Sequence, residues 1–174
     1  MSDITLSSRT GIRPFRSRAG SPRIVTYPAA STCASTARIV AGQVVQLDAT
    51  STSNHKIIRA STAAGHPNLS TNIIGIAAQS DDGTVTDPPL SVWAQDGNTE
   101  FIFPTKIAGT GSSLVGTALA LGFDSTLSIH YLAANSTAGD LRVWVTDVLN
   151  PGDTNGYVVG RFFSTAVAPA VWTR

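Results

Sequence analysis

The sequence predicts an all-β protein: a small β-barrel, β-tulip or sandwich body with an extended N-terminal arm and at most one short helix. Short runs of apolar and β-branched residues recur along the chain, and Gly, Pro, Asn or Asp residues separate them, which is typical of a sandwich or barrel. Charged residues make up only 13% of the chain, about half of the usual ~25%. A surface with few charges and many Ser and Thr residues suits extended strands and wide contacts with other proteins.

The predicted strands follow one another with short turns between them. The apolar run Ile73–Ala78 predicts a strand buried on both faces. Asp96-Gly97, directly after Leu90–Ala94, predicts a hairpin. Residues 114–121 fit either a short helix or a strand, because serines precede them but glycines interrupt them. The full set of predicted strands is 24–27, 43–47, 55–60, 73–78, 90–94, 99–103, 127–132, 141–149, 157–163 and 166–172.

The chain divides by charge into a basic arm, residues 1–23, and a single β-rich domain, residues 24–174. The arm holds five arginines against one aspartate, a net charge of +4, whereas the remainder is mildly acidic at −3. Pro14 and Pro22 fix φ and disfavour helix before them. Apolar residues are sparse and not periodic here, so we expect the arm to stay mobile until a partner holds it.

Two kinds of partner could neutralise the arm. Arginines on a flexible segment can contact nucleic acid phosphates, or they can pair with carboxylates on an acidic protein surface. Five arginines are a modest charge for packaging a genome, and the arm also carries apolar side chains that can fill protein pockets. We therefore favour a protein surface. The predicted contact residues are Arg9, Arg13, Phe15, Arg16, Arg18, Arg23 and Tyr27.

No motif for catalysis or metal binding is recognisable. The sequence contains no P-loop and no Gly-x-Ser-x-Gly elbow. Cys33 is the only cysteine, and His55, His66 and His130 are scattered, so neither a nucleophile with its base nor a zinc site is expected. The segment Asn150–Gly156 is the nearest candidate for a calcium-binding loop, but a plain turn is the better interpretation. We expect no enzymatic activity, no cofactor and no metal.

The three tryptophans are candidates for subunit contacts. Trp93 and Trp144 lie within predicted strands among Val and Leu residues, and Trp172 lies near the C-terminus. Aromatic residues are favoured at the core and at protein interfaces. Stacking on a glycan is the alternative for these side chains. No run approaches the ~20 apolar residues that span a membrane, so a membrane partner is not expected.

Apolar residues and glycines recur together in four segments: Ala41–Asp48, Ile73–Ala77 followed by Asp82-Gly83, Val115–Leu121, and Gly156–Phe162. These segments resemble the capsid decoration (cement, or head-stabilising) proteins of tailed bacteriophages. The resemblance extends over roughly residues 37–163 and consists of apolar–Gly patterns. It implies a small barrel or tulip-like body that docks on the outside of a capsid, often as an oligomer on symmetry axes. The Ser/Thr-rich stretch Ala49–Asn54 and the loop Ser61–Asn72 depart from the pattern.

From this resemblance we expect a non-enzymatic structural protein of the virion, on the outer capsid surface, assembled in the host cytoplasm. Its expected partners are the major capsid protein and copies of itself, with a trimer as the expected oligomer; nucleic acid is not expected as a partner. Cementing a shell requires no catalytic group, only many weak contacts acting together. The alternatives are a jelly-roll coat protein whose arginine arm faces nucleic acid, and a glycan-binding module of a tail or fibre.

Overall fold

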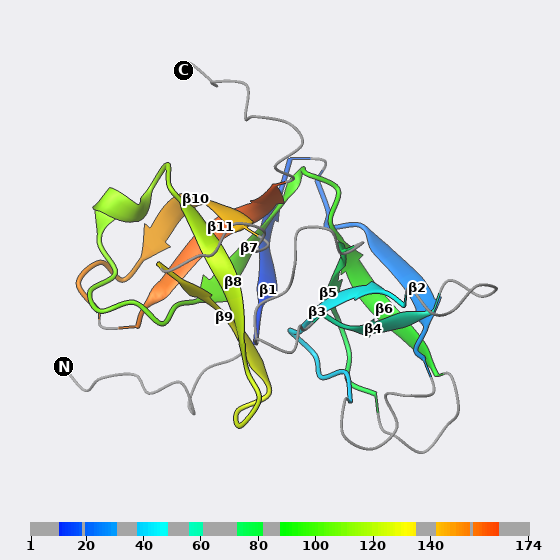
Figure 1. Cartoon of the computed structure of the whole chain (residues 1–174). Helices are drawn as coiled ribbons and strands as arrows, with labels where there is room; N and C mark the ends of the chain where they lie inside the picture. Colours follow the sequence, from blue (N-terminus) through cyan, green and yellow to red (C-terminus); the bar gives the residue numbers. More distant parts are fainter. Residues whose placement is uncertain are drawn as a thin grey trace.

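The computed structural model describes residues 11–18, 20–30, 38–48, 56–60, 73–81, 88–134, 142–153 and 155–163. Within these ranges the chain forms eleven strands and a single 3-10 turn, η3 (Ser112–Leu114). The strands form two antiparallel sheets, which lie beside each other with β1 (Arg13–Ser17) between them (Figure 1). The prediction of an all-β fold with at most one short helix is therefore confirmed for the described part of the chain.

The larger sheet has six strands, and its far edge bends back toward β7. An isolated parallel bridge between Thr105 and Leu132 connects the end of β7 with β9. The sheet is therefore strongly curled, with one face enclosed. The order of its strands is β1, β7 (Thr99–Pro104), β11 (Tyr157–Phe163), β10 (Arg142–Leu149), β8 (Ala118–Asp124) and β9 (Ile129–Ala133).

The smaller sheet has five strands and curls in a similar way. A parallel bridge between Ala29 and Ile57 connects the end of β2 with β4. Neither sheet is closed by a continuous ladder, so the architecture corresponds to the sandwich form of the prediction. The order of its strands is β2 (Ile24–Pro28), β6 (Pro89–Ala94), β5 (Ile73–Ala77), β3 (Val44–Leu47) and β4 (Ile57–Arg59).

The core consists of two hydrophobic clusters, of which the first is shared by both sheets. The first cluster centres on Phe101, Phe103 and Phe162, whose ring centroids lie 5.5–6.3 Å apart in tilted or edge-to-face arrangements. Val44 and Ile76 of the smaller sheet belong to the same cluster, so both sheets share this core. The second cluster lies within the curl of the smaller sheet. Its buried members are Ala29, Ala30, Ile39, Val45, Ile57, Ala77, Leu90 and Val92.

The strand predictions differ from the structure mainly at turns. Residues 114–121, which fitted either a helix or a strand, form β8 from Ala118 onward, after η3. The strand predicted from Leu127 begins only at Ile129, because the Asp124 carboxylate accepts the backbone N–H groups of Thr126 and Leu127 and holds them in a turn. The strand predicted at 166–172 lies outside the described residues.

The expectation of a separate, mobile arm up to residue 23 requires correction. Ile12 is only 1% exposed and belongs to the first cluster. Arg13–Ser17 pair with β7, and the Ile12 N–H donates to the Gly42 carbonyl near the smaller sheet. Residues 12–17 are therefore part of the body, because one buried apolar side chain and a strand ladder offset their ordering entropy. Residues 1–10, including Arg9, lie outside the described ranges.

The burial of Ile12 leads to a direct test of this correction. Ile12→Ala is expected to lower the free energy of unfolding by about 2–4 kcal/mol, because it leaves a cavity in the shared core. Ile24→Ala removes the same side chain where it is 57% exposed, and we expect a change within about 0.5 kcal/mol. Urea denaturation of both variants measures the difference. If both variants lost an equally small amount of stability, residues 11–18 would not belong to the folded body.

Candidate protein-binding surface

One stretch of the surface combines arginines with exposed apolar side chains where the chain crosses from one sheet to the other. β1 is one of the two edge strands of the larger sheet, and β2 is one of the two edge strands of the smaller one. We call the exposed arginines and large apolar residues of this crossing the crossover patch. Phe15 and Ile24 are 44% and 57% exposed, and they are two of the four large hydrophobic residues that are exposed in the described ranges. The patch consists of Arg13, Phe15, Arg16, Arg18, Arg23 and Ile24.

The edge formed by β1 is poorly suited to pairing with another strand. Pro14 has no backbone N–H to donate. The register shifts between Pro14 and Arg16, which leaves Phe15 as the extra residue of a β-bulge. Proline and bulges are features by which edge strands avoid adding further strands. A partner of this edge would therefore be bound mainly through side chains.

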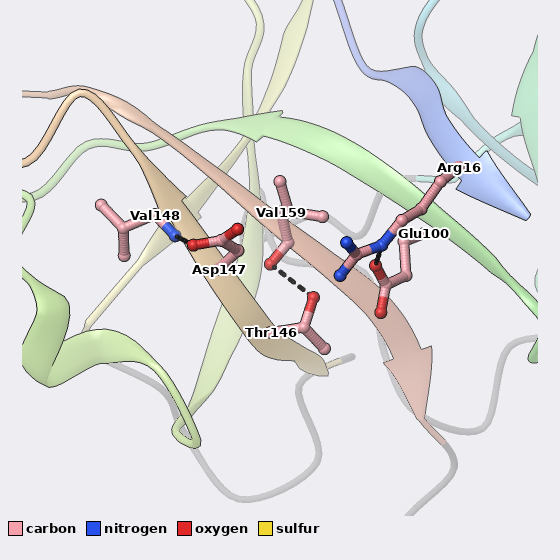
Figure 2. Close-up of polar contacts among 6 residues, drawn as sticks. All are labelled: Arg16, Glu100, Thr146, Asp147, Val148 and Val159. Atoms are coloured by element: carbon pink, nitrogen blue, oxygen red, sulfur yellow. Dashed lines mark hydrogen bonds and ion pairs between the residues drawn. The ribbon is translucent and has the colours of Figure 1, made fainter.

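The charge of the patch is one-sided. Residues 11–30 contain four arginines and no acidic residue. Arg16 forms an ion pair with Glu100 of β7, with Nε and Oε2 separated by 2.5 Å (Figure 2). The Arg13 guanidinium lies 5.9 Å from the ring centroid of Tyr157. With four arginines and no carboxylate of its own, this stretch is basic and attracts anionic groups.

Five of the seven residues that the sequence predicted for the contact lie in this patch: Arg13, Phe15, Arg16, Arg18 and Arg23. Tyr27 does not belong to it, because its half-buried side chain packs against the second hydrophobic cluster. Ile24 was missed, since it begins a predicted strand and an apolar strand residue is ordinarily expected to be buried. No signal in its neighbours would have indicated its exposure.

Two of the three tryptophans lie in the described residues, and they belong to different sheets. Trp93 is half-buried and packs against the first cluster, and it pairs across the ladder with Ile24 on one side and Ile76 on the other. Trp144 is half-buried on β10, opposite Arg161. Trp172 lies outside the described residues. Trp93 therefore links the edge strand that carries Ile24 to the shared core, and its predicted role in subunit contacts stays a prediction.

A second polar feature, the buried ring of His130, joins the two sheets. Nδ1 of His130 accepts the backbone N–H of Val44 at 3.2 Å, and Nε2 lies 2.7 Å from the carbonyl oxygen of Ala60. The ring also packs on Phe123, with centroids 4.8 Å apart. The pKa of His130 is lowered to about 4, chiefly by burial; the hydrogen bond to Ala60 opposes this shift, and the charge of nearby Arg59 adds to it.

A shallow hollow of about 290 Å³ lies beside this joint. It is lined by Gly11, residues 40–43 and residues 127–129. The Gln43 amide spans it, donating to the Ser128 carbonyl and accepting the Val40 N–H. These bonds connect the segment before β3 with the segment before β9, so Gln43 contributes to the joint between the sheets.

The described residues hold no group of three or more His, Cys, Asp or Glu side chains that could bind a metal ion. Cys33, His55 and His66 lie outside the described ranges. Around Asn150–Gly156, the Gly152 N–H donates to the Thr110 carbonyl, and the Thr110 N–H donates to the Asp153 carbonyl. Nearby, the Asp147 carboxylate accepts the Val148 N–H, and the Thr146 hydroxyl donates to the Val159 carbonyl (Figure 2). These contacts are structural.

Within the described part of the chain, no helix has the length and apolar character needed to cross a membrane. Comparison with protein-family models, with curated proteins and with solved structures finds no match to this chain. The candidate function therefore depends on the crossover patch and on the segments of the sequence described above.

Proposed function

We propose that this chain is a capsid decoration protein, which binds the outer surface of a shell of major capsid protein and stabilises it. The observation that carries the proposal is the crossover patch, where four arginines and two exposed apolar side chains follow one another between residues 13 and 24. The apolar–Gly segments that resemble tailed-phage decoration proteins support it. Copies of the chain associate on the shell, and a trimer is the expected oligomer.

The composition of the patch favours a protein partner over nucleic acid. Arginine and aromatic residues are enriched at protein interfaces, whereas lysine is depleted, and the patch contains no lysine. Phe15 and Ile24 have no use on a phosphate backbone but can fill apolar sockets on a protein. Individual contacts of this size are weak, and repetition over a symmetric shell raises the effective concentration of each one.

Charge reversal in the patch provides the test. The double variant Arg18→Glu/Arg23→Glu is expected to bind empty capsids of the source virus at least about tenfold more weakly, because like charges then oppose an acidic surface. Arg38→Glu, another exposed arginine outside the patch, is the matched control and should bind as the wild type does. Co-sedimentation at low and moderate salt measures both.

Three outcomes would decide against the proposal. Equal binding by the double variant would remove the patch from the contact. Absence of capsid binding by the wild type would refute the decoration function. Self-assembly into shells with steeply salt-dependent nucleic acid binding would favour the coat protein alternative. Deleting residues 1–23 is not a suitable test, because the deletion also removes β1 and Ile12 from the folded body.

A further inference from the structure

Glu100 occupies an unusual position beneath the crossover patch. It is an acidic residue on β7, the strand next to the edge strand β1, and its side chain is only 5% exposed, while that of its partner Arg16 is 57% exposed. A buried carboxylate is unfavourable unless a cation or several donors compensate it. Arg16 therefore leans inward over the sheet toward Glu100 instead of extending freely into solvent (Figure 2).

The same arginine also positions its neighbour. Cζ of Arg16 lies 5.5 Å from the ring centroid of Phe15, within the range of a cation–π contact. Phe15 is the bulge residue of β1, so it has no partner residue opposite it on β7. A bulge re-aims the side chain that it carries. The ring is thus directed by the backbone on one side and by the Arg16 guanidinium on the other.

We propose that Glu100, through Arg16, holds Phe15 as a pre-formed anchor that inserts into an apolar socket on an acidic protein surface. This inference rests on the proposed function and identifies the residue at the centre of that contact. An exposed side chain that is already fixed loses less conformational entropy on binding. Aromatic and arginine side chains in desolvated pockets are the residues that dominate binding energy at interfaces.

The chemistry of the occupant follows from the surroundings of Phe15. Four arginines and no acidic residue lie within residues 11–30, so the rim of the socket should carry carboxylates. Pro14 and the bulge disfavour an added strand, so the partner contributes a pocket and not a backbone edge. Glu100 is a positioning residue in this arrangement, because Arg16 lies between it and the partner.

Binding to empty capsids tests the anchor. Phe15→Ala is expected to weaken binding about 30-fold, the effect of losing one dominant interface residue. Val115→Ala is the matched control, since Val115 is similarly exposed at 45% but lies outside the patch. Glu100→Gln should weaken binding about tenfold by releasing Arg16. Arg16→Lys keeps the charge but loses the Nε donor, and it should resemble Glu100→Gln.

A second measurement on the full-length protein does not depend on the capsid. In the wild type, the Nε–H of Arg16 should exchange with water more slowly by NMR than the Nε–H of exposed Arg38, and Glu100→Gln should abolish the difference. Equal exchange at Arg16 and Arg38 would overturn the positioning role. Capsid binding by the wild type with unchanged binding by Phe15→Ala would overturn the anchor alone. No binding by the wild type would instead refute the proposed function.

Discussion

Lowering the pH from 7 to 4 is expected to reduce the free energy of unfolding by about 3 kcal/mol through His130 alone. The pKa of His130 falls from its usual 6.5 to about 4 in the folded protein. Between these two values the unfolded chain binds a proton that the folded chain does not. Stability from this residue is therefore complete above about pH 6.5 and is lost progressively as the pH falls toward 4.

Burial of the ring is the main cause of this effect, and two contacts of the ring act in the same direction. Nδ1 accepts the Val44 N–H, so in the neutral ring the proton lies on Nε2, which donates to the Ala60 carbonyl. Protonation of Nδ1 would replace that acceptor with a second donor facing the N–H. Arg59, whose guanidinium lies 4.2 Å from the centroid of the Phe123 ring, adds a positive charge nearby. The Val44 N–H and the Arg59 charge therefore both favour the neutral ring, whereas the Ala60 hydrogen bond opposes them.

The contribution of His130 can be isolated by comparing two proteins. His130→Asn retains an acceptor near the position of Nδ1 but cannot titrate in this range. Urea denaturation at pH 7, 6, 5 and 4 should show a steeper loss of stability for the wild type than for the variant, with a difference that grows to about 3 kcal/mol. Parallel curves for the two proteins would show that His130 does not carry the pH dependence.

This dependence has a structural meaning, because His130 connects the two sheets. The ring extends from β9 of the larger sheet to the backbone at the start of β3 and just after β4 in the smaller one. The Gln43 side chain makes a parallel connection to Ser128. Acid is therefore expected to weaken the joint between the sheets more directly than the ladders within either sheet.

The sequence predicted those elements whose signals are local. Val143 and Val145 alternate with half-buried residues along β10, and this alternation alone indicates a strand with one buried face. The Asp96-Gly97 turn between β6 and β7 was also recognisable, and the Asp96 carboxylate accepts the N–H groups of Asn98 and Thr99 there. Such features depend on neighbours in the chain, so sequence patterns can reveal them.

Elements that depend on distant partners were not predictable in this way. β1 contains two arginines and a proline, and its stability derives from β7, which lies more than 80 positions further along the chain. The basic composition of the patch was visible in the sequence, but the burial of Glu100 beneath Arg16 was not. The sequence likewise could not distinguish His130 from an exposed histidine, because its burial depends on contacts with Val44 and Ala60, which lie far away in the chain.

Gly75→Ala is expected to destabilise the protein by about 3 kcal/mol, at the upper end of the usual range for overpacking. Gly75 lies on the central strand β5, between β3 and β6. A Cβ atom at this position would lie 2.0 Å from the carbonyl oxygen of Trp93. That oxygen belongs to the backbone of β6, so the contact can be relieved only by moving one strand away from the other.

Displacement of β6 would also move Trp93, which packs against the core shared by both sheets. The damage should therefore extend beyond one ladder and appear as a lower midpoint in urea for the whole domain. Gly111→Ala is the matched control, because Gly111 has a φ of −118° and its Cβ would meet only the Ser113 hydroxyl at 3.6 Å. That change should be neutral or stabilise by up to about 1 kcal/mol. If Gly75→Ala were equally neutral, β5 and β6 would not approach each other closely at Trp93. The contact that links Ile24 on β2 through Trp93 to the shared core would then also be incorrect.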